Sequence, residues 1–301
     1  MKQIRFIVLT FLTLLLSSCA NEEARIDASG SFEALEIIVS AEATGKIESL
    51  DIHEGDQLKE GQVLGKIETV LLELKREQLL ASREGMKSRI MNIPIQTAAL
   101  SQEIETLKAE KIRIENLLKS DAVNTKQLDD IKAQLAMMEK QIYARKVSLN
   151  NANQEIQNEM AALNSQIAQV DEQIKNSLIC SPITGSVLVK YAEKGEFTIN
   201  GKGLFKLADL DQMYLRAYIT SGQLSRVKLG QTITVLSDFG DKEFRNYKGR
   251  ITWISDKAEF TPKTVQTKDE RANLTYALKV SVPNDGFLKI GMYGGIILDD
   301  E

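Results

Sequence analysis

Histidine, cysteine, tryptophan and proline are scarce in this chain of 301 residues, which holds one histidine, two cysteines, one tryptophan and four prolines. A single histidine excludes a histidine-rich metal centre, and two cysteines exclude a disulfide scaffold and a four-cysteine zinc site. The 38 basic and 42 acidic residues leave a net charge of −4, which excludes an electrostatic nucleic-acid binder. Because 43% of the residues are apolar, the chain can bury a core and is not a disordered polymer.

The N-terminal segment, residues 1–19, has the pattern of an export signal. Lys2 and Arg5 precede a largely apolar run, Phe6–Leu16, which is too short to cross a bilayer as a helix. The following Leu16-Ser17-Ser18-Cys19 resembles the lipobox of bacterial lipoproteins, which implies removal of residues 1–18 and lipid attachment at Cys19. The alternative is an ordinary secretory signal followed by an incidental cysteine. A lipid on Cys19 would hold the chain at a membrane without spanning it.

Glycine, proline and aromatic residues are rare between residues 70 and 177, where Gly85, Pro94 and Tyr143 are the sole examples. Helix-forming residues fill the remainder, which predicts long helices. Apolar residues recur there every seven positions, and this strict spacing keeps one seam only when helices supercoil around a partner. The two columns are Leu72, Leu79, Met86, Ile93, Leu100, Leu107 and Ile114, then Leu128, Leu135, Ile142, Leu149, Ile156, Leu163 and Val170.

A chain reversal is expected between the two columns. Asn124, with Gln127 following it, has the pattern of a helix N-cap and its capping-box partner. Two helices of about 50 residues each would then form an antiparallel coiled-coil hairpin about 75 Å long. We expect Pro94 to kink or loosen the first helix near its middle. Because the apolar seam is narrow, the hairpin should stand out in solvent rather than join a thick bundle.

An internal repeat flanks the predicted hairpin. Residues 39–67 and 179–207 align without a gap, so that position 39 matches position 179 and the offset stays constant throughout. Each copy has the pattern of short strands separated by a Thr-Gly turn and a Gly-Asp or Gly-Glu turn. One copy buries too little surface to fold alone, so the two are expected to close one small β-sandwich. The identical pairs are Thr44/Thr184, Gly45/Gly185, Gly55/Gly195, Gly61/Gly201, Leu64/Leu204 and Lys66/Lys206.

The repeat copies, around Gly45–Gly61 and Ser181–Val187, each resemble half of a lipoyl/biotinyl-type domain. Two such halves around a helical hairpin resemble the periplasmic adaptor, or membrane fusion protein, family (HlyD-like). The resemblance implies an elongated α+β fold, with a coiled-coil hairpin inserted in a split half-lipoyl (barrel-sandwich hybrid) domain and a small antiparallel β-barrel after it. The implied parts are a signal peptide at 1–18, a linker at 19–35, the lipoyl-like domain at 36–69 and 178–209, the hairpin at 70–177 and the barrel at 210–301.

Alternating strand patterns separated by turn signals follow residue 210 and predict the small barrel. Because little sequence follows the last expected strand, we expect the extra membrane-proximal domain of some adaptors to be absent or vestigial. A polar, charged loop at 260–271 resembles a segment of adaptors that partner ABC-type exporters; the alternative is a solvated connection between strands. Its candidate transporter-contacting residues are Thr261, Pro262, Lys263 and Arg271.

The expected hairpin tip resembles a second family motif. Arg113, Leu117 and Asn124, at spacings of +4 and +11, are similar to the Arg…Leu…Ser motif with which many adaptors engage an outer-membrane channel. The +4 spacing puts Arg113 and Leu117 on one helical face, and the turn brings Asn124 near them. Asn124 replaces the serine of the motif, and Thr125 offers a hydroxyl beside it. The alternative is that Leu117 packs the tip and Arg113 is a solvated charge.

The expected function is that of a non-enzymatic adaptor in a tripartite efflux or secretion system. The resemblance implies two partners: an inner-membrane transporter, with the ABC type favoured, and an outer-membrane TolC-like channel. It also implies a homo-oligomer, expected to be a hexamer. A lipid anchor, favoured in the inner membrane, would place the chain in the periplasm. No cofactor, metal or nucleic acid is expected.

Two other functions fit part of the sequence. A lipoyl or biotinyl carrier explains the half-domains, but its modified lysine belongs in the turn that the helical segment replaces, whereas Lys66 and Lys206 fall inside repeat strands. A scaffold lipoprotein of the envelope explains the helices and Cys19 but leaves the split repeat and the barrel without a role. His53 is expected to be solvated, and Cys180 to be a small buried apolar residue.

Overall fold

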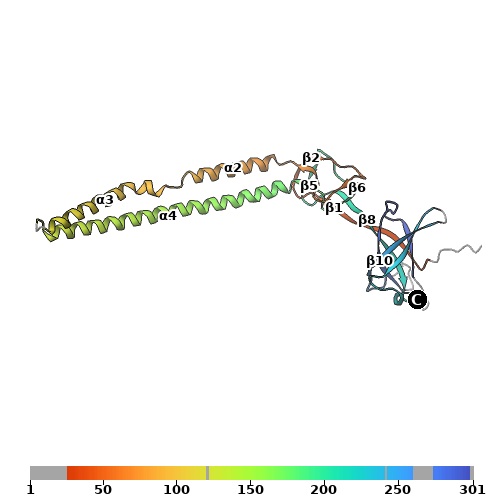
Figure 1. The fold of residues 1–301 in the computed structure, drawn as a ribbon. Helices are drawn as coiled ribbons and strands as arrows, with labels where there is room; N and C mark the ends of the chain where they lie inside the picture. Colours follow the sequence, from red (N-terminus) through yellow and green to blue (C-terminus); the bar gives the residue numbers. More distant parts are fainter. Residues whose placement is uncertain (1–25, 120–121, 241–242, 260–273, 299–301) are drawn as a thin grey trace, which may run out of the picture.

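The computed structural model describes residues 26–119, 122–240, 243–259 and 274–298. The molecule is elongated, with a helical hairpin on one side of a small β domain and a β-barrel on the other (Figure 1). The hairpin contains α2 (Val70–Lys87), α3 (Ile93–Leu118) and α4 (Thr125–Lys175), and both α2 and α3 pack along α4. The predicted fold class is confirmed: a hairpin inserted in a split domain and followed by a barrel.

The two heptad columns form the seam of the hairpin. None of their residues is exposed; those that are fully buried are Leu107, Ile114, Leu149, Ile156 and Val170. Helix α2 has no fully buried residue, whereas α3 has four. The seam is therefore thinner in the half of the hairpin next to the β domain. Solvent surrounds the hairpin on its other faces, as the narrow apolar stripe predicts.

The two repeat copies fold into one domain. The first copy supplies β2 (Gly45–Leu50), β3 (Gln57–Leu58) and β4 (Val63–Ile67), and the second supplies β5 (Leu178–Cys180), β6 (Gly185–Lys190) and β7 (Phe197–Thr198). Pairs β2–β7, β3–β6 and β4–β5 all join one copy to the other. Both copies also share one apolar core, whose members include Ile47, Ile52, Leu64, Val187, Leu204 and Phe205. Neither copy has a core of its own, which explains why both are required.

A pseudo-two-fold relation connects the copies. The N–H of Gly55 donates to the carbonyl of Val187 at 2.8 Å, and the N–H of Gly195 donates to that of Ile47, also at 2.8 Å. In the alignment of the two copies Gly55 matches Gly195 and Ile47 matches Val187, so the two hydrogen bonds are equivalent. Gly55 and Gly195 have φ angles of +94° and +93°, a backbone region that favours glycine. The same relation links the 2.8 Å bonds Gly61→Ser181 and Gly201→Ala41.

Six strands close the β-barrel. Their order is β1 (Ala28–Ser40), β12 (Tyr293–Ile297), β9 (Thr232–Asp238), β10 (Phe244–Ile254), β11 (Thr275–Pro283) and β8 (Gly203–Thr220), and β8 pairs back with β1. Short helix η1 (Leu224–Arg226) follows β8. The fully buried core residues of the barrel include Phe32, Leu215, Val235 and Val280. Strands β1 and β8 run on into the lipoyl-like domain, so two paired strands connect the β domains.

The linker expected at 19–35 differs from the structure in its second half. Strand β1 begins at Ala28, and residues Ala28–Ser31 pair with β12 on one side and largely with β8 on the other. A Cβ at Gly30 would lie 1.9 Å from the carbonyl oxygen of Arg216, so the close approach of β8 requires glycine there. The small residues Ser29–Ser31 lack the alternating apolar pattern that marks the other strands, so the sequence does not predict a strand there.

Candidate partner-contact surfaces

The hairpin tip is organised around the start of α4. Asn124 is the N-cap: its Oδ1 accepts a hydrogen bond from the backbone N–H of Lys126 at 3.0 Å. The hydroxyl of Thr125 donates to the same Oδ1 at 3.3 Å, and the backbone N–H of Gln127 donates to the Asn124 carbonyl at 3.0 Å. The N-cap predicted from the sequence is confirmed. The amide oxygen of Asn124 is therefore occupied in holding the helix start.

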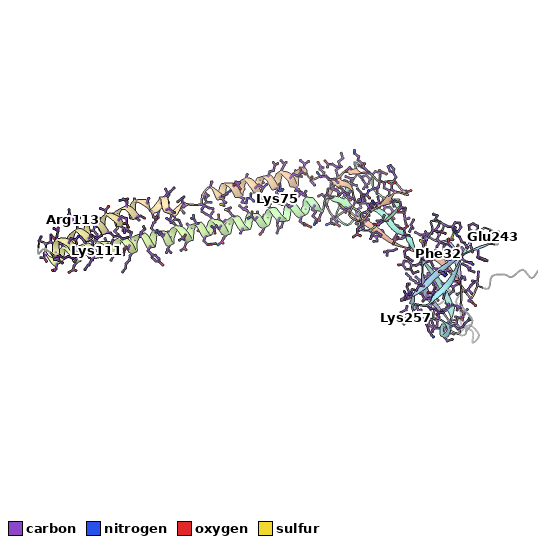
Figure 2. All side chains as sticks on the ribbon, in the orientation of Figure 1. Phe32, Lys75, Lys111, Arg113, Glu243 and Lys257 are labelled. Carbon is purple, nitrogen blue, oxygen red and sulfur yellow. The ribbon has the colours of Figure 1, made fainter. Side chains whose placement is uncertain are left out.

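Arg113 and Leu117 present a charge and an apolar group to solvent at the tip. The Arg113 side chain is 70% exposed and pairs with Glu110 one turn earlier, at 2.7 Å. Leu117 is 38% exposed. Exposed ion pairs contribute little to stability, so Arg113 can exchange Glu110 for an acidic group of a partner at small cost. Figure 2 shows Arg113 near the end of the hairpin that is remote from the β domain. Contact of these residues with a channel remains a prediction.

The first helical arm of the hairpin, which leads away from the β domain, is interrupted at residues 88–92. Where a kink or local loosening of one helix was expected at Pro94, the helix is broken completely, because α2 ends at Lys87 and a new helix, α3, begins at Ile93. Pro94 lies in the first turn of α3, where its missing N–H costs nothing, and Asn92 caps the helix by accepting from the N–H of Ile95 at 3.2 Å. Sequence inspection identified the proline but missed the capping asparagine before it.

Asn153 of α4 holds this interruption in place. Its side-chain Nδ2 donates to the carbonyl of Met91 at 2.9 Å, and its Oδ1 accepts from the N–H of Met91, also at 2.9 Å. One amide therefore satisfies both backbone groups of a residue that has left the helix. We call this arrangement the Asn153 clasp. A heptad count cannot identify it, since a polar residue near a seam has no distinctive spacing.

A polar network joins α2 to the lipoyl-like domain. The hydroxyl of the buried Thr69 donates to Glu73 Oε1 at 2.6 Å, and Lys66 Nζ lies 3.4 Å from the same oxygen and 3.8 Å from Glu48. The hydrogen bond from Thr69, followed by that from Lys66, holds the pKa of Glu73 below its ordinary value. This network ties the first turn of α2 to strand β4, at the point from which the hairpin projects.

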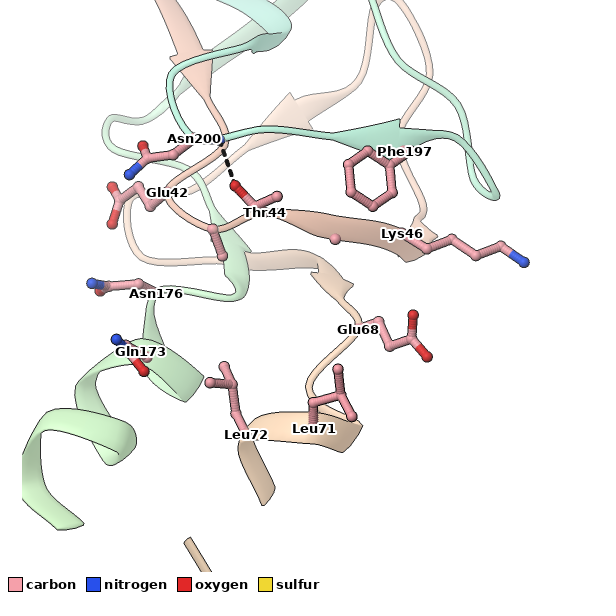
Figure 3. Close-up of a pocket in the computed structure, with 12 residues that line it drawn as sticks. Glu42, Thr44, Lys46, Glu68, Leu71, Leu72, Gln173, Asn176, Phe197 and Asn200 are labelled. Atoms are coloured by element: carbon pink, nitrogen blue, oxygen red, sulfur yellow. Dashed lines mark hydrogen bonds between the residues drawn. The ribbon is translucent and has the colours of Figure 1, made fainter. Parts of the chain in front are cut away.

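A hollow of about 750 Å³ lies where the hairpin meets the lipoyl-like domain (Figure 3). Leu71 of α2 and Phe197 of β7 line it, and they are 82% and 65% exposed. On the same side as Phe197 and across from Leu71, the hydroxyl of Thr44 accepts a hydrogen bond from the N–H of Asn200 at 3.2 Å. The sequence did contain a signal for this surface, because Phe197 aligns with the polar Gln57 in the other repeat copy.

Several predicted residues lie outside the part of the chain that the structure describes: Cys19, Thr261, Pro262, Lys263 and Arg271. His53 is exposed, as predicted, with Nδ1 3.7 Å from Asp56 Oδ2. Cys180 is half-buried rather than fully buried. Within the described ranges, no group of three or more histidine, cysteine, aspartate or glutamate residues is placed to hold a metal ion. No described helix is long and apolar enough to cross a membrane.

The fold agrees with a family of known proteins. The family model "RND MFP, barrel-sandwich hybrid domain" matches residues 36–209, which is more than half of the chain. This chain belongs to the membrane fusion protein family. Members are adaptor proteins of efflux systems in the cell envelope, act with inner-membrane transporters and outer-membrane channels, and are generally not enzymes.

Relatives and solved structures of other adaptors resemble the chain over most of its length. A "UPF0194 membrane protein" of Yersinia pseudotuberculosis is 25% identical, covering 90% of this chain and 89% of the relative. UPF0194 membrane protein YbhG of Salmonella paratyphi B is 26% identical, covering 90% and 88%. Among solved structures, MacA from Actinobacillus actinomycetemcomitans has a TM-score of 0.55 at 20% identity, covering 89% of this chain and 76% of its own. Spr0693 from Streptococcus pneumoniae R6 has 0.51 at 17%, covering 91% and 98%. These structural similarities concern the fold.

Proposed function

We propose that this membrane fusion protein bridges an inner-membrane transporter and an outer-membrane TolC-like channel in a tripartite efflux or secretion system. The observation that carries the proposal is the arrangement around the split domain, from which the hairpin and the barrel extend to opposite ends. Arg113 and Lys257 mark these ends (Figure 2). An elongated adaptor with a contact surface at each end can hold two membrane proteins at a fixed separation. Neither contact requires catalysis by the chain itself.

The orientation follows from a lipid on Cys19, which forms part of the proposal. Ile26, where the described structure begins, follows closely on Cys19, and the intervening chain spans at most about 25 Å when fully extended. The start of β1 lies at the end of the barrel remote from the hairpin, because Asp27 contacts Leu298 and Gln223 there. An anchored barrel therefore leaves the hairpin pointing away from the membrane, towards a channel on the far side of the periplasm.

The transporter is proposed to be of the ABC type. The support is the resemblance of residues 260–271 to the corresponding segment of adaptors that partner ABC exporters, while the family model carries the RND label. The two transporter classes differ in composition, because an ABC exporter includes an ATPase subunit. Identification of the protein that copurifies with the chain therefore distinguishes them.

We propose that the chain forms a homo-oligomer, expected to be a hexamer, through its lipoyl-like domains. Support comes from the two repeat copies. Each two-residue strand has an outward and an inward side chain: Gln57 and Leu58 in β3, Phe197 and Thr198 in β7. Because β3 forms with the polar Gln57 at its outward position, the fold does not require an apolar side chain there. The exposed Phe197 at the equivalent position of β7 therefore serves another purpose. Contact with a neighbouring copy would cover Phe197 and the adjoining Leu71.

Native mass spectrometry of the Phe197→Gln variant tests the oligomer. This change makes β7 resemble β3 on its outward face, so the fold should persist while the oligomer dissociates. The matched control is Ile95→Gln, because Ile95 is 71% exposed but lies on the hairpin. A Phe197→Gln chain that keeps the wild-type oligomer would show that this surface takes no part in assembly.

Copurification from detergent-solubilised envelopes tests the bridge. Leu117→Asp at the tip should lose the channel and keep the transporter, because an exposed apolar contact is replaced by a charge. Ile95→Asp, on the same helix but away from the tip, should keep both. Retention of the channel by Leu117→Asp would refute the tip assignment, and failure of the wild-type chain to retain either partner would refute the adaptor function.

The positions of Lys66 and Lys206 bear on the alternative that the chain is a lipoyl or biotinyl carrier. Lys206 Nζ lies 2.8 Å from Glu36, and Lys66 is paired with Glu48 and Glu73. Both lysines lie within strands, Lys66 in β4 and Lys206 in β8, rather than in an exposed turn. A lipoyl or biotinyl group on either lysine would add to the mass of the purified chain, which intact-mass measurement detects. The adaptor proposal predicts no such addition. The scaffold alternative predicts unchanged export after deletion of the hairpin.

A further inference from the structure

Among the residues that the structure describes, large and exposed apolar side chains lie at the end of the barrel remote from the hairpin. Ile26 is 40%, Leu229 70% and Trp253 41% exposed. Strand direction places them at this one end: Ile26 precedes β1, Leu229 precedes β9, and Trp253 is the penultimate residue of β10. The pairing of Arg250 with Thr232 confirms that β10 ends where β9 begins. We call these three residues the barrel-end patch.

Leu229 is held outward on a rigid turn. Gly230, with φ +83°, donates its N–H to the Ile251 carbonyl at 2.8 Å, and its own carbonyl accepts from Arg250 Nε at 3.1 Å. The exposed Lys228 precedes Leu229, so basic groups lie on both sides of the projecting apolar side chain. Apolar side chains between basic residues are typical of surfaces that lie in the headgroup region of a bilayer.

The lipid proposed on Cys19 would bring this end of the barrel to a membrane. The side-chain Nε2 of Gln223 donates to the Asp27 carbonyl at 2.6 Å, which ties the segment before Leu229 to the start of β1. With Cys19 lipidated, the start of the described chain cannot be more than about 25 Å from the lipid. This step rests on the proposed anchor. A tether of this length gives an effective concentration in the millimolar range, so a weakly binding patch suffices.

We propose that the barrel-end patch rests on the bilayer that holds the lipid anchor, with Trp253 and Leu229 in the headgroup region. Tryptophan favours that region because its ring is amphipathic. Among the described residues, the basic Lys228, Arg250 and Lys257 are accompanied by the acidic Asp27, Asp256 and Glu259 at the same end of the barrel. The apolar side chains rather than net charge therefore supply the binding, and zwitterionic lipid should suffice.

Trp253 makes a direct test available, since it is the sole tryptophan of the chain. The full lipidated chain is reconstituted into phosphatidylcholine vesicles with and without brominated acyl chains, and tryptophan emission is recorded. The expected result is a blue shift relative to detergent-free unlipidated chain, quenching by the brominated lipid, and loss of both in Leu229→Asp. The control carries Trp253→Phe with Tyr143→Trp, because Tyr143 is 71% exposed on the hairpin; its emission should not be quenched.

Each outcome of this experiment supports or overturns the proposal. Equal emission with and without brominated lipid, in a chain shown by intact mass to carry the lipid, overturns the patch and leaves the anchor standing. An unlipidated intact mass overturns the anchor instead, and vesicle titration of that chain then tests the patch alone. Quenching only with phosphatidylglycerol assigns binding to charge and contradicts the apolar contact. An emission shift that appears only when transporter is added assigns the patch to that protein.

Discussion

Replacing Asn153 by alanine removes both hydrogen bonds of the Asn153 clasp while leaving α4 a good helix. Each bond between partly buried groups contributes about 0.5–1.5 kcal/mol, and alanine returns about 0.6 kcal/mol through its higher helix propensity. The free energy of local opening around Met91 should therefore fall by about 0.4–2.4 kcal/mol, which raises the rate of amide hydrogen exchange about 2- to 60-fold. Hydrogen exchange of the Met91 amide, resolved by fragment mass spectrometry or NMR, measures this change.

The matched control is Asn164→Ala on the same helix. Asn164 accepts from the exposed Arg83 guanidinium at 3.4 Å and satisfies no backbone group, so its loss should leave exchange at residues 88–92 unchanged. Fast exchange at Met91 in the wild-type chain would contradict the clasp. An equal response to both substitutions would assign the effect to α4 as a whole, and no response to Asn153→Ala would refute the energetic reasoning.

Two further predictions concern the lipoyl-like domain and the hairpin base. Gly55→Ala and Gly195→Ala should each destabilise the fold by about 1 kcal/mol, because a Cβ meets no neighbour within 4 Å and only backbone strain remains; urea unfolding that separates the two widely would contradict the pseudo-two-fold relation. Because the pKa of Glu73 is lowered in the folded chain, the stability that its carboxylate contributes is present above the unfolded-state pKa and is lost as pH falls through the lower folded-state pKa. The protection of the amides in the first turn of α2 against hydrogen exchange, expressed relative to the intrinsic exchange rate at each pH, should therefore fall on acidification, and Glu73→Gln should abolish that dependence; identical pH profiles of protection would refute the role of the Thr69–Glu73 bond.

Periodic features of the sequence predicted the architecture well. The heptad columns and the constant offset between the repeat copies each repeat a physical constraint many times, so chance residues do not hide them. Single contacts were not predictable in this way. The Asn153 clasp depends on one amide meeting Met91 across the hairpin, and the early start of β1 depends on Gly30 allowing β8 to approach. The hollow at Leu71 and Phe197 arises where α2 and β7 meet, and these are far apart in the sequence.

Photo-crosslinking from the two ends of the molecule tests the bridging claim most directly. A photoreactive residue at Leu117 samples the hairpin tip, and one at Lys257 samples the barrel end; mass spectrometry of crosslinked products from living cells identifies the partners. The adaptor account predicts an outer-membrane protein from position 117 and an inner-membrane transporter or lipid from position 257. Recovery of the same partner from both positions, or of an inner-membrane protein from the tip, would contradict it.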